Sequence, residues 1–111
     1  MERIVEQTLL YDFYGELLTA HQKQVYEYYL NDYSMSEIAD EIGTSRQAVH
    51  DLIKRCNKIL AEYEDKLKLV EKFELAKDKL NEIHRLAKES EDKNPVINQI
   101  ENLSSEIIED F

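Results

Sequence analysis

Hydrophobic residues recur every three or four positions along almost the whole chain. Over residues 3–18 they are Val5, Leu9, Leu10, Phe13, Tyr14, Leu17 and Leu18. This spacing predicts a helix with a wide apolar stripe. Thr19 and Gln22 then form a capping-box pair, which predicts a second helix over residues 20–31. The inward face of that helix would consist of Val25, Tyr26, Tyr29 and Leu30.

Residues 35–54 have the pattern of two helices joined by a tight turn. Ser34 and Glu37 are spaced as a capping box, and Gly43 permits the positive φ of a sharp helix exit. Thr44 or Ser45 would cap the second helix. The buried stripe of that helix would be Val49, Leu52 and Ile53, and its opposite side would carry Arg46, Gln47, His50, Asp51 and Lys54. This pattern predicts a helix-turn-helix, whose second helix can enter a nucleic-acid groove.

Residues 46–89 contain neither glycine nor proline, and their apolar stripe becomes heptad-like from Phe73. A stripe of this length requires either a bend near residues 61–66 or a second chain to cover it. Residues 90–95 predict a turn, after which residues 96–111 form a last helix that packs antiparallel on 73–89. We therefore predict an all-α fold. A helix-turn-helix domain spans 1–62, and a C-terminal helical hairpin spans 63–111 and serves as a dimerisation element.

The charge of the chain is unevenly distributed. The net charge is −10, which opposes general nucleic-acid binding. Residues 1–43 carry two basic and nine acidic side chains, and residues 73–111 carry five basic and ten acidic ones. Residues 44–72 carry seven basic and five acidic side chains and form the only positive segment. Nucleic-acid binding should therefore be local and salt-sensitive, or should need a partner protein.

The second helix of the motif carries the candidate binding residues. They are Ser45, Arg46, Gln47, His50, Lys54, Arg55 and Lys58. Arginine can read guanine and glutamine can read adenine, while the basic residues at 54, 55 and 58 can meet phosphates. The alternative is an ordinary solvated helix face, and Asp51 on the same face opposes binding to DNA.

Two residue types are expected in the core rather than at a site. The seven tyrosines fall mostly on apolar stripes, where they fill space between short helices; stacking platforms for bases are the alternative. Cys56 also falls on a buried stripe, which favours a structural thiol over a reactive one.

Other chemistry finds little support in the sequence. His21, His50 and His84 are widely separated, so we expect no metal site. No catalytic set and no glycine-rich phosphate loop is evident, so we expect no enzyme activity, no cofactor and no small-molecule substrate. The sequence has no signal-like segment and no apolar run of membrane-spanning length, which predicts a cytoplasmic protein.

Three sequence runs resemble a known family. They are Phe13-Tyr14 with Leu17-Leu18-Thr19; Asp32-Tyr33-Ser34 with Glu37-Ile38-Ala39; and Ser45-Arg46-Gln47-Ala48-Val49 with Ile53-Lys54-Arg55. Over residues 4–75 the chain looks like the YlxM family of Gram-positive bacteria and mycoplasmas. Its core is also similar to the fourth region of bacterial sigma factors, which binds promoter DNA as a helix-turn-helix.

The resemblance implies a role in protein targeting. The family is commonly encoded beside the protein component of the signal recognition particle and is thought to act in that targeting pathway. One hypothesis is therefore an accessory or regulatory protein of this pathway that binds its ribonucleoprotein. The alternatives are a dimeric DNA-binding transcriptional regulator and an interaction protein that does not contact nucleic acid.

Overall fold

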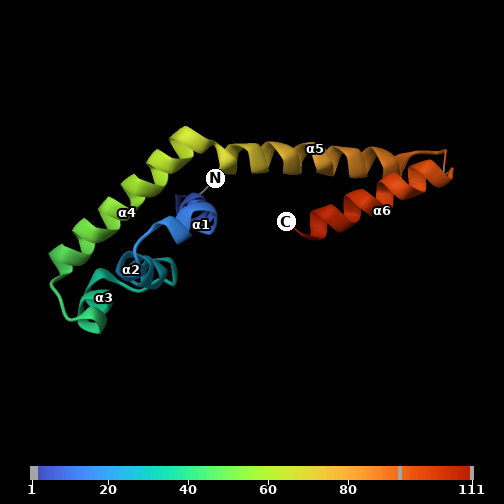
Figure 1. Ribbon diagram of the computed structural model, residues 1–111. Helices are drawn as coiled ribbons and strands as arrows, with labels where there is room; N and C mark the ends of the chain where they lie inside the picture. Colours follow the sequence, from blue (N-terminus) through green and yellow to red (C-terminus); the bar gives the residue numbers. More distant parts are fainter. Residues whose placement is uncertain (1–2, 93, 111) are drawn as a thin grey trace. The chain divides into compact units, whose positions relative to one another are not determined.

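The computed structural model describes residues 3–92 and 94–110. Six α-helices and one short 3-10 helix make up most of this part of the chain, and it contains no strand (Figure 1). The elements are α1 (Arg3–Tyr14), η1 (Gly15–Leu17), α2 (Ala20–Leu30), α3 (Met35–Ile42), α4 (Arg46–Leu67), α5 (Leu69–Glu89) and α6 (Pro95–Glu109). The predicted all-α class is confirmed.

The chain divides into two compact units, residues 1–70 and 71–111. We call the first the helix-turn-helix unit and the second the hairpin unit. The domain boundary after residue 62 stays a prediction, because a division into compact units does not test which segments fold independently.

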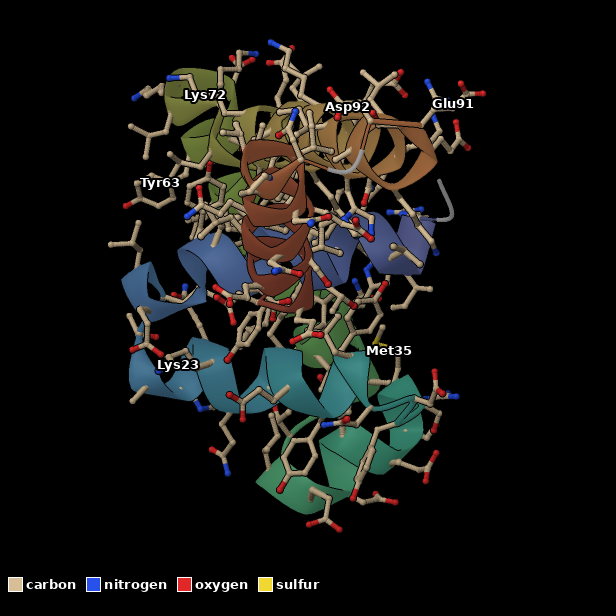
Figure 2. All side chains as sticks on the ribbon, turned by 90° about the vertical axis from the view of Figure 1, so that its right-hand side faces the viewer. Lys23, Met35, Tyr63, Lys72, Glu91 and Asp92 are labelled. Atoms are coloured by element: carbon tan, nitrogen blue, oxygen red, sulfur yellow. The ribbon has the colours of Figure 1, made fainter. Side chains whose placement is uncertain are left out.

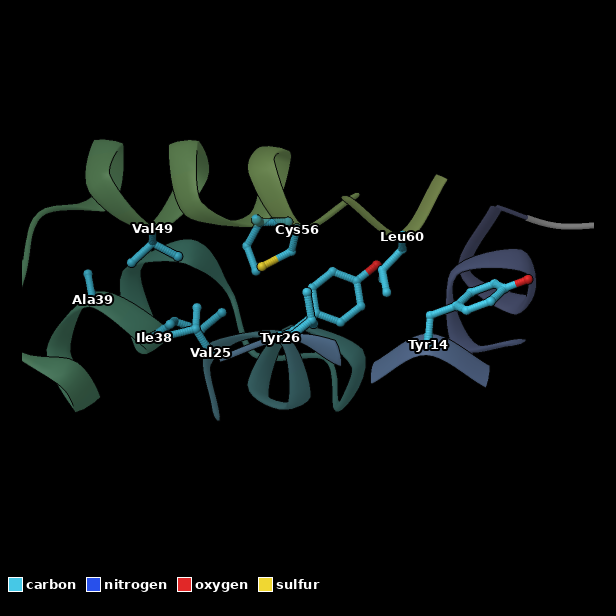
Figure 3. Packing of buried hydrophobic residues seen from close by; sticks show 10 residues of the cluster. Tyr14, Val25, Tyr26, Ile38, Ala39, Val49, Cys56 and Leu60 are labelled. Carbon is cyan, nitrogen blue, oxygen red and sulfur yellow. The ribbon is translucent and has the colours of Figure 1, made fainter. Parts of the chain in front are cut away.

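One hydrophobic cluster holds the helix-turn-helix unit together. Its buried members are Tyr14, Leu18, Val25, Tyr26, Ile38, Ala39, Val49, Ile53, Cys56 and Leu60 (Figure 3). They come from α1, α2, α3 and α4 and from the residue after η1. α4 packs against each of the three preceding helices and therefore forms the spine of this unit.

The first helix is shorter than predicted. α1 ends at Tyr14, and the chain tightens into η1 rather than continuing to residue 18. A Cβ on Gly15 would lie 2.9 Å from a ring carbon of Tyr11, so this turn packs directly beneath the Tyr11 ring. The predicted apolar stripe was also too wide: Val5, Phe13 and Leu17 are exposed, because the neighbouring helices cover only part of it.

The long helix is interrupted at Lys68, just after the region where a bend was expected. Lys68 has a φ of 57°, in the left-handed region, and its N–H donates to the carbonyl of Glu64 at 2.8 Å. Glu64 Oε1 accepts hydrogen bonds from the Tyr14 hydroxyl at 2.5 Å and from the Val70 N–H at 3.0 Å. The Tyr14 hydroxyl in turn accepts from the Leu69 N–H at 3.1 Å. These side chains satisfy the first N–H groups of α5 where the helix restarts.

The hairpin unit consists of most of α5 and of α6, which folds back beside it (Figure 1). His84 Nδ1 lies 3.1 Å from Ser104 Oγ and 3.3 Å from the carbonyl oxygen of Glu101. Asn94 caps α6 and Pro95 occupies its first turn, as the predicted turn requires. Phe111, the last residue of the predicted stripe, lies outside the described residues. Charged side chains such as Lys72 and Glu91 extend from this unit into solvent (Figure 2).

Candidate nucleic-acid interface

The predicted helix-turn-helix is formed by α3, a tight turn and α4. The Glu37 N–H donates to Ser34 Oγ at 3.1 Å, and the Ser34 N–H donates to Glu37 Oε1 at 3.0 Å. This capping box lowers the pKa of the Glu37 carboxyl, chiefly through the hydrogen bond from the Ser34 backbone. Gly43 has a φ of 72° and ends α3. Of the two predicted caps of α4, Ser45 is the one used: its Oγ accepts from the Ala48 N–H at 3.1 Å.

The buried face of α4 fixes which side of the helix meets solvent. Val49 is fully buried opposite Ile38 and Ala39 of α3 (Figure 3). Ile53, Cys56 and Leu60 continue this face toward α1 and α2, while Leu52 is half-buried. Every predicted site residue of α4 is therefore exposed: Arg46, Gln47, His50, Lys54, Arg55 and Lys58, with Ser45 exposed at the cap.

The site residues gather around two adjoining hollows. Ser45, Arg46, Gln47 and His50 line the first hollow together with Met35, which lies at the start of α3 (Figure 2). His50 and Lys54 line the second with Met35, Arg3, Tyr29, Ile53 and Asn57. Arg55 and Lys58 line neither hollow, although both are exposed on α4. The structure thus brings five of the seven predicted residues together.

Asp51 interacts with the residues that would read bases. Gln47 Nε2 donates to Asp51 Oδ1 at 3.0 Å, and His50 Nδ1 lies 3.9 Å from the same oxygen. The Gln47 amide must leave this hydrogen bond before it can pair with a base. A protonated His50 would be partly neutralised by the same carboxylate, so Asp51 weakens the attraction of this face for phosphate.

Two polar residues of the second hollow were not among the predicted site residues. Arg3 comes from α1 and Asn57 from the third turn of α4. The available signal was Arg3 itself, which is one of only two basic residues among the first 43. Asn57 gave no signal, because its partner, the buried Tyr26, lies on another helix and donates to Asn57 Oδ1 at 2.5 Å.

Among the described residues, the structure supports neither a metal site nor a reactive thiol nor a membrane-spanning helix. No group of three or more His, Cys, Asp or Glu side chains among them is placed to hold a metal ion. Cys56 is buried, as predicted, and burial raises the pKa of its thiol to about 11. A thiol with such a pKa carries little thiolate at neutral pH and is a poor nucleophile. In the part of the chain that the structure describes, no helix is both long and apolar enough to cross a membrane.

Comparison with known proteins agrees with this geometry. The family model described as "Putative helix-turn-helix protein, YlxM / p13 like" (UPF0122) matches residues 1–103. The UPF0122 protein YlxM of Bacillus subtilis is 42% identical over 104 residues, which cover 93% of this chain and 94% of the relative. A UPF0122 protein of Clostridium novyi is 43% identical over 113 residues and 98% of each chain. One of Clostridium kluyveri is 53% identical over 72 residues, 64% of this chain and 65% of the relative. The chain belongs to the UPF0122 family of YlxM / p13-like helix-turn-helix proteins.

Proposed function

We propose that the chain binds nucleic acid, as part of a ribonucleoprotein, through the exposed face of α4. The observation that carries the proposal is a basic helix face in a strongly acidic protein. Residues 45–58 carry four basic side chains and one acidic one, while the whole chain has a net charge of −10. The buried stripe of α4 holds this face toward solvent at the start of the second helix of the motif, where such motifs meet base edges.

Within this face, the side chains divide by chemistry. Ser45, Arg46, Gln47 and His50 surround one hollow near the start of α4 and are suited to base edges. Lys54, Arg55 and Lys58 follow along the exposed side and are suited to phosphates. Base reading and backbone contact would thus occupy successive turns of one helix.

The target we favour is a component of the signal recognition particle, which the protein would serve as an accessory or regulatory factor in the cytoplasm. The resemblance to the YlxM family supports this pathway. The charge of the chain supports an assembly that contains basic protein, because an acidic surface attracts such a partner and repels bare nucleic acid. The α4 face would then contact the RNA while the acidic remainder contacts protein.

A dimeric DNA-binding regulator is the second candidate. One observation favours it: the hairpin unit exposes large apolar side chains on both of its helices. They include Leu75, Ile83, Leu86, Val96, Ile100, Leu103 and Ile107. We propose that a second copy of the chain covers this surface, which would bring two α4 helices to one DNA molecule. Sedimentation over a range of concentrations tests the dimer, and Leu103→Glu should shift the equilibrium to monomer.

The decisive experiment is capture of purified signal recognition particle on the immobilised full-length protein at moderate salt. The wild type should retain the particle, and Lys54→Glu combined with Lys58→Glu should abolish retention. The matched control is Lys77→Glu combined with Lys79→Glu, which makes the same change in charge on exposed positions of α5. No retention by the wild type would refute the targeting role.

Selection of bound fragments from genomic DNA separates the two candidates. A single recovered motif that Arg46→Ala weakens by about 1–3 kcal/mol would identify a transcriptional regulator. Uniform recovery of all sequences that disappears as salt is raised would exclude the regulator.

A further inference from the structure

The second hollow combines side chains from all four helices of the helix-turn-helix unit. It measures about 320 Å³ and is lined by Arg3, Tyr29, Met35, His50, Ile53, Lys54 and Asn57. Arg3 comes from α1 and Tyr29 from α2, while Met35 starts α3 and the remaining residues belong to α4. Among the described residues, its lining includes two cationic side chains and one histidine, but no carboxylate.

Other hollows on the same unit have a different character. One contains Glu16, Lys23 and Glu27, and Lys23 Nζ lies 2.8 Å from Glu16 Oε1. Another contains both Glu62 and Lys66. In contrast, Arg3 and Lys54 make no ion pair with any residue in the described ranges 3–92 and 94–110. Two cations without an ion pair to any described residue therefore face one hollow of a protein whose net charge is −10.

The polar groups beside these cations are already oriented. The Tyr26 hydroxyl donates to Asn57 Oδ1 at 2.5 Å, which leaves the NH₂ group of Asn57 as the donor available to a ligand. Burial raises the pKa of the Tyr26 hydroxyl, while the positive charge of Arg3 acts to lower it. Arg3 is thus close enough to act electrostatically on the buried tyrosine to which Asn57 is bonded.

We propose that this hollow binds a phosphate group in the backbone of the nucleic acid that lies on α4. Arg3 would donate to the phosphate oxygens from one side and Lys54 from the other, and the NH₂ group of Asn57 would add a neutral donor. His50 and Met35 line both hollows, so a strand whose bases meet Arg46 and Gln47 continues directly to Arg3. The inference rests on the proposed function and extends its interface from α4 to α1.

The first test measures binding of the full-length protein to random-sequence duplexes of RNA and of DNA, each about 20 base pairs long, over a range of salt. Arg3→Gln should weaken binding and reduce the slope of log affinity against log salt by about one, the value for one lost phosphate contact. Arg85→Gln is the matched control, because Arg85 lies in the hairpin unit and is already paired with Glu82 and Glu89. It should leave the slope unchanged.

A second variant, Asn57→Asp, should keep the fold while removing a hydrogen-bond donor from the hollow. Asn57→Asp retains an oxygen that accepts from Tyr26 but replaces the donor NH₂ group with a repelling carboxylate oxygen. It should weaken binding at least as much as Arg3→Gln, with unchanged thermal unfolding. Wild-type affinity and slope in both Arg3→Gln and Asn57→Asp would overturn the inference and leave the proposed function intact.

Titration of the ¹⁵N-labelled protein with inorganic phosphate, followed by NMR, separates the two proposals. Shifts at the Asn57 NH₂ group and the Arg3 side chain that Arg3→Gln abolishes would support the site. If neither duplex binds the wild type, the same phosphate-induced shifts would assign the hollow to a small phosphate compound and overturn the inference, while the proposed function would still be decided by capture of the signal recognition particle. If the duplexes do not bind and phosphate causes no shifts, the inference is overturned; absence of particle capture as well would overturn the proposed function.

Discussion

In the helix-turn-helix unit, ten buried hydrophobic residues form one cluster that four helices share. In the described part of the hairpin unit, by contrast, only Ala87 and Ser104 are buried, and several large apolar side chains remain exposed. Because burial of apolar surface is the main favourable term in folding, the first unit has a source of stability that the second lacks. Two helices side by side bury too little surface to form a core.

Hydrogen bonds differ between the units in the same way. Tyrosine hydroxyls connect distant helices in the first unit: Tyr29 donates to Gln7 Oε1 at 3.0 Å, and Tyr14 reaches Glu64 at the end of α4. In the described part of the hairpin unit, the contact between His84 and Ser104 joins α5 to α6, whereas Arg85 pairs with Glu82 and Glu89 on its own exposed helix face. Such exposed pairs contribute little to stability. The first unit is thus specified by tertiary contacts, and the second mainly by local ones.

The largest expected effect is the difference in stability loss between two leucine-to-alanine substitutions, one in each unit. Leu60→Ala removes a fully buried side chain and should lower the free energy of unfolding of the helix-turn-helix unit by about 2–5 kcal/mol. Leu86→Ala removes a side chain that is 56% exposed in the single chain, and in a monomer it should change stability by less than about 0.5 kcal/mol.

Tyrosine fluorescence during urea unfolding measures the first unit alone, because all seven tyrosines precede residue 71. Circular dichroism reports on the helices of both units. A loss of helix stability in Leu86→Ala as large as that in Leu60→Ala would contradict the comparison. It would mean that Leu86 is covered in solution by another chain.

Two residues with left-handed backbone conformation give the next largest effects. Gly43 has a φ of 72°, and among the described residues no heavy atom beyond its two chain neighbours lies within 4 Å of the Cβ that another residue would carry there. Gly43→Ala should therefore destabilise the helix-turn-helix unit through backbone strain alone, by about 1–2 kcal/mol. Lys68 carries such strain already, so Lys68→Gly should stabilise the same unit by up to about 1 kcal/mol.

Unfolding followed by tyrosine fluorescence should show a lower free energy of unfolding for Gly43→Ala and a higher one for Lys68→Gly. A destabilising Lys68→Gly would show that the flexibility of glycine outweighs the relief of strain. The junction before the hairpin unit would then depend on a stiff residue at position 68.

Local patterns predicted the features that neighbouring residues determine. The capping boxes at Thr19 and Ser34 and the left-handed Gly43 follow from residues a few positions apart, and the structure contains all three. The exposed side of α4 was also predictable, because the side chains on the buried stripe determine it.

Features that depend on distant parts of the chain were not predictable. Phe13 of α1 and Leu17 of η1 lie on the apolar stripe of the first segment but stay exposed, because packing against distant helices decides which part of the stripe is covered. Lys68 gives no sequence signal for its left-handed conformation, which depends on the hydrogen bonds of Tyr14 and Glu64 around it. Arg3 joins the second hollow only because α1 packs against α4.

Loss of one helix cap in each unit should cost about 1 kcal/mol and should affect different signals. Ser34→Ala removes the cap of α3 and should lower the tyrosine-detected free energy of unfolding by about this amount. Asn94→Ala removes the bond from the Ile97 N–H to Asn94 Oδ1, which measures 3.0 Å, and should destabilise α6 similarly. Its effect should be visible in circular dichroism and absent from tyrosine fluorescence. If Asn94→Ala lowered the free energy of unfolding equally in circular dichroism and in tyrosine fluorescence, the two units would unfold together.

The smallest effect concerns the pH dependence of the buried thiol, which only the helix-turn-helix unit contains. Burial raises the pKa of Cys56 from its ordinary value of 9.0 to about 11, so the folded unit holds this proton more tightly than the unfolded chain does. The resulting stability is fully present below pH 9 and is lost progressively as the pH rises toward 11. At pH 9.5 the loss should be below about 1 kcal/mol. Unfolding followed by circular dichroism should show that the free energy of unfolding falls more from pH 8 to 9.5 in the wild type than in Cys56→Ala. The cavity that Cys56→Ala creates destabilises the unit equally at both pH values. Identical declines would mean that the thiol ionises without unfolding, and that the core around α4 admits water.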